Sequence, residues 1–124
     1  MINPTVEDPL DLLFLDLGSF RFVPRARRRN KQWYRADYTI RKLALNYRDP
    51  LIRARRLAFA TYAYYVREYI RRRDLGEQQA ELDRVRQGLE SLHHPTVWRE
   101  MQRQHLNYAE LRELFGKAPE ALRW

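Results

Sequence analysis

Residues 49–73 form the longest stretch of the sequence with a helical pattern of apolar side chains. Asp49 can accept hydrogen bonds from the first backbone amides of a helix, and Pro50 suits the first helical position, where an amide hydrogen is not needed. The apolar side chains then recur at spacings that place them on one side of a helix: Ile52, Phe59, Ala63, Val66 and Ile70. The sequence therefore predicts one long helix over 49–73.

Two further stretches repeat apolar residues at helical spacing, and we expect a helix in each. The first covers residues 31–47, with the apolar face Trp33, Ala36, Ile40, Leu43 and Tyr47. The second has a narrow seam that suits a helix lying antiparallel on the 49–73 helix: Leu82, Val85, Leu89 and Leu92.

The C-terminal part of the chain predicts short helices. Thr96 can cap a helix after Pro95, and Asn107 with Glu110 has the spacing of a capping box for a helix over 108–115. Gly116 would end that helix, and one more turn is expected around Pro119.

We therefore expect an all-α fold, a small antiparallel helical bundle or hairpin with an extended arginine-rich N-terminal arm. Among all segments, only Phe20–Val23 suggests a strand. The expected organisation is a short acidic, apolar helix and the arm over residues 1–30, a helical domain over 31–116 and a tail over 117–124.

The short helix at residues 8–17 is predicted by Asp8-Pro9 and by apolar residues at positions i, i+3, i+4 and i+7: Leu10, Leu13, Phe14 and Leu17. Gly18 is its expected end. So short a helix is marginal in water by itself, so we expect this docking helix to contact another subunit.

The composition excludes several classes of function. A chain of 124 residues suits one small domain, and the lack of cysteine excludes disulfides, thiolate metal sites and cysteine nucleophiles. His93, His94 and His105 lack the spacing of a helical metal pair, and we interpret them as surface or capping residues. We expect no enzyme activity, no metal, no cofactor and no transmembrane span.

The positive charge is concentrated in one third of the chain. The formal net charge is +8, and residues 21–56 hold 13 Lys and Arg against two acidic residues. Basic residues interleave with aromatic ones in the predicted arm, whose binding residues are Arg21, Arg25, Arg27, Arg28, Arg29, Lys31, Trp33, Tyr34 and Arg35. This pattern suits ribosomal or other RNA, anionic lipid headgroups, or acidic surfaces of neighbouring subunits. We rank protein contact first.

A second basic surface is predicted on the 49–73 helix. At 100° per residue, one face combines arginines with an aromatic ring: Arg53, Arg56, Tyr64, Arg67 and Arg71. We expect this face to meet an acidic partner or phosphate.

Residues 45–92 resemble the LYR-motif family of small mitochondrial three-helix proteins. The Leu-Tyr-Arg motif corresponds to Leu45-Asn46-Tyr47-Arg48, and residues 65–73 and 85–92 are similar to the family's second- and third-helix segments. Asn46 interrupts the motif, and Asp49-Pro50 falls where the family's first helix is continuous.

The resemblance implies a role on the matrix side of mitochondria. Members of the family are accessory subunits of respiratory complex I, assembly factors or partners of acyl carrier protein, which binds a basic helical face. The positions that could carry this over are Tyr47, Arg48, Arg53 and Arg67, which extends the basic helix face to Tyr47 and Arg48.

Three functions remain open at this stage. The first is a non-catalytic accessory subunit of a large mitochondrial multi-protein assembly, with a respiratory-chain complex as the first candidate. In this function, tail aromatics such as Trp124 would be exposed. The second is an RNA-binding ribosomal protein that uses the arm at 21–35. The third, a small enzyme or ligand carrier, would need a pocket that no sequence feature predicts.

Overall fold

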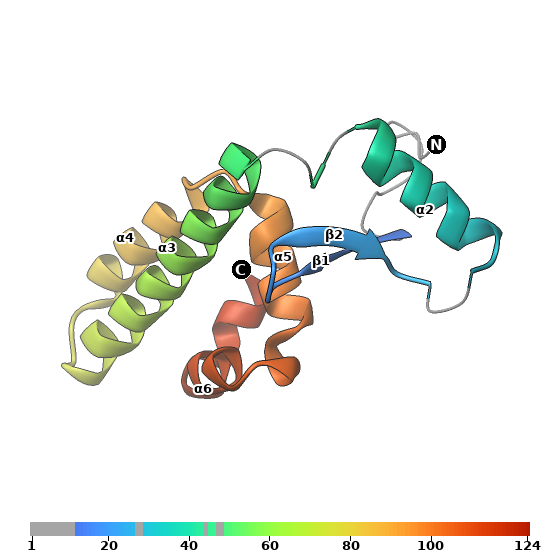
Figure 1. Ribbon diagram of the computed structural model, residues 1–124. Coiled ribbons are helices and arrows are strands. Elements are labelled where there is room, and N and C mark those ends of the chain that lie inside the picture. The colour runs from blue at the N-terminus through green and yellow to red at the C-terminus, as the bar shows by residue number, and fades with distance from the viewer. Residues whose placement is uncertain (1–11, 27–28, 44, 47–48) are drawn as a thin grey trace. The chain divides into compact units, whose positions relative to one another are not determined.

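The computed structural model describes residues 12–26, 29–43, 45–46 and 49–124. About 71% of the described residues are helical, and a small two-stranded antiparallel sheet accompanies the helices (Figure 1). The chain is therefore mostly helical, but the prediction of a purely α-helical fold is wrong. Contacts along the chain divide it into two compact units, residues 1–56 (unit 1) and 57–124 (unit 2), which we describe separately.

Unit 1 contains a β-hairpin where the docking helix was predicted. Strand β1 (Leu13–Asp16) pairs antiparallel with β2 (Arg21–Pro24), with Leu13 opposite Pro24 and Asp16 opposite Arg21. The prediction of a helix over 8–17 is therefore wrong for Leu13, Phe14 and Leu17, whereas Leu10 lies outside the described residues. The run of consecutive apolar residues fits both helical and alternating periods, and the pairing with β2 decides between them.

The turn between the strands is built by the side chain of Asp16. Its carboxylate accepts hydrogen bonds from the Gly18 amide (3.1 Å) and from Ser19 Oγ (2.7 Å). Phe20 ends the turn with φ 59°, in the left-handed region that few residues other than glycine adopt. The Asp-Leu-Gly-Ser segment therefore reverses the chain, which a continuing helix would not do.

Helix α2 (Lys31–Lys42) covers the hairpin and closes the core of unit 1. Its N-cap is Asn30, whose side chain accepts a hydrogen bond from the Trp33 amide (2.9 Å). Leu13, Ala36 and Ile40 form the buried centre, with Leu12, Phe22 and Leu45 packed against it.

The helix predicted over 31–47 is shorter than expected. It ends at Lys42, and Leu43 is 55% exposed although it was placed on the apolar face. The Leu45 amide instead bonds the Ile40 carbonyl, and its side chain joins the core. A continuing helix would turn Leu45 about 140° away from Ile40, so the helix has to end for this contact to form. Tyr47 lies outside the described residues.

Helix α3 (Asp49–Asp74) confirms the long helix predicted over 49–73. Its first residues belong to unit 1 and the remainder to unit 2. The predicted stripe is buried at Ile52, Ala63, Val66 and Ile70, and Phe59 is half-buried.

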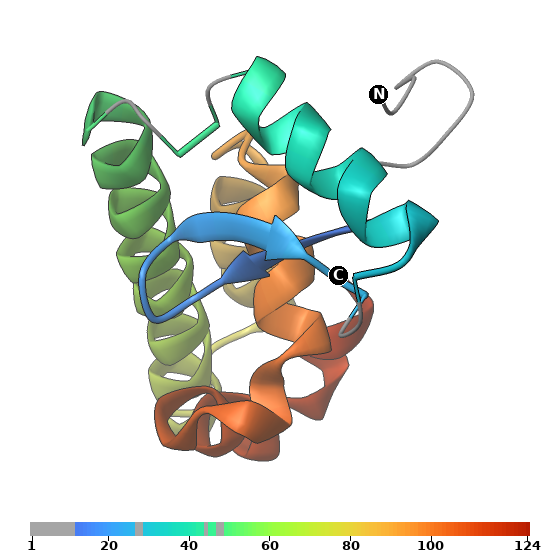
Figure 2. The same cartoon turned by 45° about the vertical axis from the view of Figure 1, so that its right-hand side comes forward.

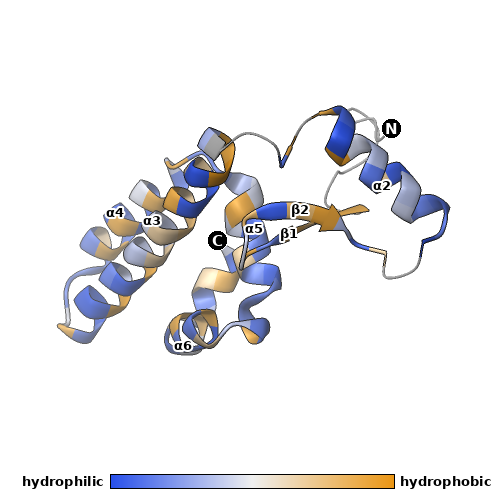
Figure 3. Ribbon diagram, in the orientation of Figure 1, coloured by the Kyte–Doolittle hydropathy of each residue, from blue (hydrophilic) through white to orange (hydrophobic). Residues whose placement is uncertain are grey.

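Helix α4 (Gln79–Glu90) lies beside α3 and runs in the opposite direction, as predicted (Figures 1 and 2). Gly76 makes the turn before it, with φ 77°. Leu82, Val85 and Leu89 are buried, whereas Leu92 lies beyond the end of the helix and is half-buried. Figure 3 shows the resulting alternation of hydrophobic and hydrophilic residues along α3 and α4.

The rest of unit 2 consists of α5 (Pro95–Arg103), the 3₁₀ turn η1 (His105–Asn107), α6 (Ala109–Lys117) and the 3₁₀ turn η2 (Pro119–Arg123). These elements match the expected short helices, but both predicted caps are wrong by at least one residue. Helix α5 begins at Pro95 after His94, and α6 follows Tyr108; neither N-cap side chain bonds the helix.

The core of unit 2 is built from aromatic rings. Trp98 stacks on Tyr62 (centroids 5.1 Å apart) and contacts Phe115 (5.8 Å). The ring of Trp124, predicted to be exposed, is half-buried and meets Tyr69 edge to face at 4.8 Å. The last residues are therefore part of the fold of unit 2.

We expect Gly88 to be required by the close approach of α3. A Cβ atom at Gly88 would lie 2.8 Å from Cε1 of Tyr65. Gly88→Ala should lower the free energy of unfolding by about 1 kcal/mol, because overpacking outweighs the gain in helix propensity. In a Tyr65→Ala background the same change should raise stability by about 1 kcal/mol. Urea unfolding of the four proteins tests this, and additive effects would contradict it.

Candidate binding surfaces

The three histidines lie on the surface or bond the backbone. His93 and His94 have exposed side chains, and His105 Nδ1 hydrogen-bonds the Gln102 carbonyl oxygen at 2.8 Å. In the part of the chain that the structure describes, no group of three or more His, Cys, Asp or Glu side chains could hold a metal ion.

The first half of the predicted arm is folded into the hairpin. Arg21 donates to the Asn46 carbonyl (2.8 Å), and Arg25 donates to the Leu13 carbonyl (3.2 Å) and lies over the Phe14 ring. The expectation of an extended arm is therefore wrong for this segment, and these two guanidinium groups have partners within unit 1. Arg27 and Arg28 lie outside the described residues.

Two residues that the sequence analysis did not select hold this hairpin in place. The Asn46 side chain accepts from the Phe22 amide and donates to the Phe22 carbonyl, both at 2.7 Å, so it acts as a short strand partner for β2. Arg55 donates to the carbonyl oxygens of Phe20 (2.9 Å) and Leu45 (2.8 Å). Burial lowers the pKa of Arg55. No local pattern marks either residue, since their partners lie 10 to 35 positions away.

The second half of the predicted arm begins α2. The side chain of Arg29 lies over the half-buried Trp33 ring (5.2 Å), and Arg35 is half-buried. Lys31 and Tyr34 are exposed, as are Tyr38, Arg41 and Lys42 farther along the helix. We call these five exposed residues the α2 face: Lys31, Tyr34, Tyr38, Arg41 and Lys42.

The basic face predicted on α3 is mostly engaged by neighbouring side chains. Arg56 lies over the Phe20 ring (5.6 Å), Arg67 pairs with Glu110, and Arg71 pairs with Glu68. Arg53 is exposed and Tyr64 is 58% exposed, whereas Tyr47 and Arg48 lie outside the described residues. Among the described arginines of this face, Arg56, Arg67 and Arg71 therefore already have partners within the chain.

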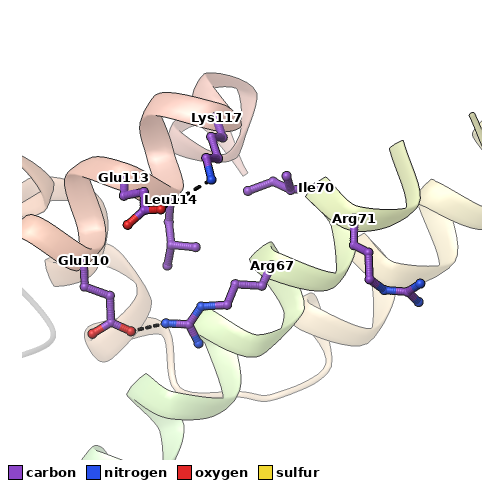
Figure 4. A pocket seen from close by; sticks show the side chains of 7 residues that line it. All are labelled: Arg67, Ile70, Arg71, Glu110, Glu113, Leu114 and Lys117. Atoms are coloured by element: carbon purple, nitrogen blue, oxygen red, sulfur yellow. Dashed lines mark hydrogen bonds and ion pairs between the residues drawn. The ribbon is translucent and has the colours of Figure 1, made fainter. Parts of the chain in front are cut away.

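A pocket of about 250 Å³ lies between α3 and α6 in unit 2 (Figure 4). Its charged groups occur largely as ion pairs, Arg67 with Glu110 and Lys117 with Glu113, around the apolar side chains of Ile70 and Leu114. The cations of this pocket already have carboxylate partners within unit 2, so the pocket offers little uncompensated charge to an anion.

Glu68 is the centre of an ion-pair cluster on α3. Its carboxylate accepts hydrogen bonds from Arg71 (3.1 Å) and Arg72 (2.9 Å), and these contacts lower the pKa of Glu68 from 4.5 to about 2. The same carboxylate raises the pKa values of Arg71 and Arg72.

This cluster predicts a dependence of stability on pH. The pKa of Glu68 is lowered in the folded protein, so the ionised carboxylate stabilises the fold. This stabilisation is complete above about pH 4.5 and is lost as the pH falls towards about 2. Glu68→Gln should therefore reduce the loss of stability in this window while leaving the other carboxyl groups to titrate. Urea midpoints measured at several pH values test this, with Glu113→Gln as the control; parallel curves for Glu68→Gln and the parent protein would contradict it.

The two units differ in their balance of charge. Unit 1 has 13 Lys and Arg against 6 Asp and Glu, a net charge of +7, and unit 2 has 11 against 10, a net charge of +1. In unit 1, the carboxylate of Asp16 is used in the turn and that of Asp37 pairs with Arg41 at 2.8 Å. The uncompensated positive charge of the protein therefore belongs to unit 1.

No helix among the described residues is long and apolar enough to cross a membrane. No protein-family model matches the sequence, and no curated protein or solved structure shows significant similarity to it. The resemblance to the LYR-motif family stays a prediction.

Proposed function

We propose that the protein is a non-catalytic accessory subunit of a large multi-protein assembly and that unit 1 attaches it to its neighbours. The resemblance to the LYR-motif family supports a mitochondrial assembly. Our first candidate is a respiratory-chain complex, with the protein on the matrix side of the inner membrane.

The observation that carries this proposal is the surface of unit 1. It combines a net charge of +7 with large exposed apolar and aromatic side chains, namely Val23, Tyr34, Tyr38, Leu43 and Leu51. Interfaces between proteins are enriched in tyrosine and arginine and use apolar anchors, whereas an isolated domain gains nothing from exposing them. Unit 2 instead neutralises most of its charges in its own ion pairs.

An RNA-binding ribosomal protein is the second candidate. The observation that favours it is the exposure of Tyr34 and Tyr38 beside Lys31 and Lys42, because aromatic rings can stack on unpaired bases while cations neutralise phosphates. Against this function, arginine side chains of α3 lie over the rings of Phe20 and Phe22, where a base would have to stack.

Sedimentation distinguishes the two candidates. The tagged 124-residue chain, expressed in its source cells, is released by gentle lysis and run through a density gradient with and without ribonuclease. We expect it to travel in a large particle that survives ribonuclease and contains respiratory-chain proteins. A particle that ribonuclease destroys would support the ribosomal function instead, and sedimentation as a free small protein would contradict both.

A further inference from the structure

We propose that the α2 face binds an acidic segment of a neighbouring protein subunit. This inference rests on the proposed function and names the partner that unit 1 would meet: a helix or strand that carries carboxylates around a few apolar side chains.

The fold of unit 1 determines which side of α2 faces outwards. Ala36 and Ile40 are buried in the core, so residues on the opposite side of the helix are turned to solvent. Tyr34 and Tyr38 are one turn apart at the centre of that side, and are 55% and 50% exposed. The α2 face is thus a continuous helical surface held by a packed core.

Cations surround the two tyrosines. Lys31 lies one turn before Tyr34, and Lys42 lies one turn after Tyr38. The backbone positions of the two lysines are therefore about 16 Å apart along the helix axis. Neither lysine forms an ion pair with any residue that the structure describes. A partner would therefore bring carboxylates to both ends of the face.

The face already holds one carboxylate from its own helix. Arg41 pairs with Asp37 at 2.8 Å while its side chain stays largely exposed. The tyrosine rings offer apolar surface, and their hydroxyl groups can donate hydrogen bonds to further carboxylates. A partner with both acidic and apolar side chains uses every group of the face.

Protein fits this surface better than RNA. Arg21 in β2 and Arg25 directly after it donate hydrogen bonds to carbonyl groups of unit 1, and the Trp33 ring is covered by Arg29. Unit 1 also exposes large apolar side chains, such as Val23 and Leu43, which find no partner in a phosphate backbone.

The test compares two double variants with the same change of net charge. Lys31→Glu with Lys42→Glu reverses the α2 face, and Arg112→Glu with Arg123→Glu reverses two exposed cations of unit 2. The readout is the fraction of protein in the ribonuclease-resistant particle. In the first variant we expect the particle-bound fraction to fall about tenfold or more below that of the parent protein, because like charges would face each other. In the second variant the fraction should stay within about twofold of the parent's. Tyr34→Ala with Tyr38→Ala should also lose about tenfold.

A folding control separates lost binding from lost structure. Each variant should keep the parent's circular dichroism spectrum and urea midpoint, since all the changed side chains are exposed. If the reversed α2 variant is folded and stays in the particle like the parent protein, this inference is wrong while the proposed function stands. If the parent protein enters no ribonuclease-resistant particle, the proposed function is wrong and this inference is wrong with it.

Photo-crosslinking identifies what lies on the face. Benzoylphenylalanine in place of Tyr34 should form a cross-link to a protein segment rich in Asp and Glu. Changing those carboxylates to Lys should then restore the particle-bound fraction of the Lys31→Glu, Lys42→Glu variant. A cross-link to RNA, to a segment without acidic residues or to residues 1–11 of the same chain would overturn the inference.

Discussion

Trp98→Ala should lower the free energy of unfolding of unit 2 by about 3–5 kcal/mol. The Trp98 ring is only 8% exposed, stacks on Tyr62 and contacts Phe115, so its removal leaves a cavity that these rings cannot fill. A domain of this size has a total stability on the order of 5–10 kcal/mol, so the variant should be close to unfolding at room temperature. Urea unfolding followed by far-ultraviolet circular dichroism measures the effect.

A matched control places the effect in the core. Leu75→Ala removes an apolar side chain that is 67% exposed, and we expect it to change stability by about 0.5 kcal/mol or less. Trp98→Phe keeps one aromatic ring and should cost less than half as much as Trp98→Ala. A cost below about 1 kcal/mol for Trp98→Ala would show that the rings do not form a close-packed core.

Arg55→Met should lower the free energy of unfolding by about 2–4 kcal/mol, because two carbonyl oxygens lose a charged donor. The guanidinium group bonds the carbonyls of Phe20 and Leu45 and lies 4.6 Å above the Phe22 ring. Methionine retains much of the apolar stem of arginine, so the loss reports mainly on these hydrogen bonds. Urea unfolding measures the total, and hydrogen exchange at the Phe22 amide measures the loosening of the hairpin.

Two further variants examine this role. Arg53→Met removes an exposed arginine from the same helix and should change stability by about 0.5 kcal/mol or less. Arg55→Lys keeps the charge but cannot reach both carbonyls in the planar geometry of arginine, so its cost should be intermediate. Equal effects of Arg53→Met and Arg55→Met would contradict a special role for Arg55.

Helices α3 and α4 could be predicted largely from the sequence. The α3 stripe of Ile52, Ala63, Val66 and Ile70 follows a pattern that extends over many turns, and the seam of α4 follows a similar one. Helical hydrogen bonds join residues four positions apart, so the information needed is local. The predicted caps at Thr96 and Asn107 were wrong because these two helices begin after His94 and Tyr108 without any side-chain cap, so a capping sequence pattern did not mark their first residues.

The candidate site could be predicted only in part. The residues Lys31 and Tyr34 were selected from composition and are exposed on α2, but Arg21 and Arg25 were selected by the same argument and have partners inside unit 1. Composition indicates which side chains could bind a partner. It does not indicate which of them form hydrogen bonds within the chain, since these bonds depend on carbonyl groups that the tertiary structure brings close.

The sequence by itself determined the long helix α3, its antiparallel neighbour α4 and the concentration of positive charge before residue 57, because periodicity and charge are properties of short segments. Only the tertiary structure decided that Leu13–Asp16 is a strand and that Asn46 and Arg55 secure the hairpin. Their hydrogen-bond partners are up to 35 residues distant, and such pairs form only when folding brings the segments together.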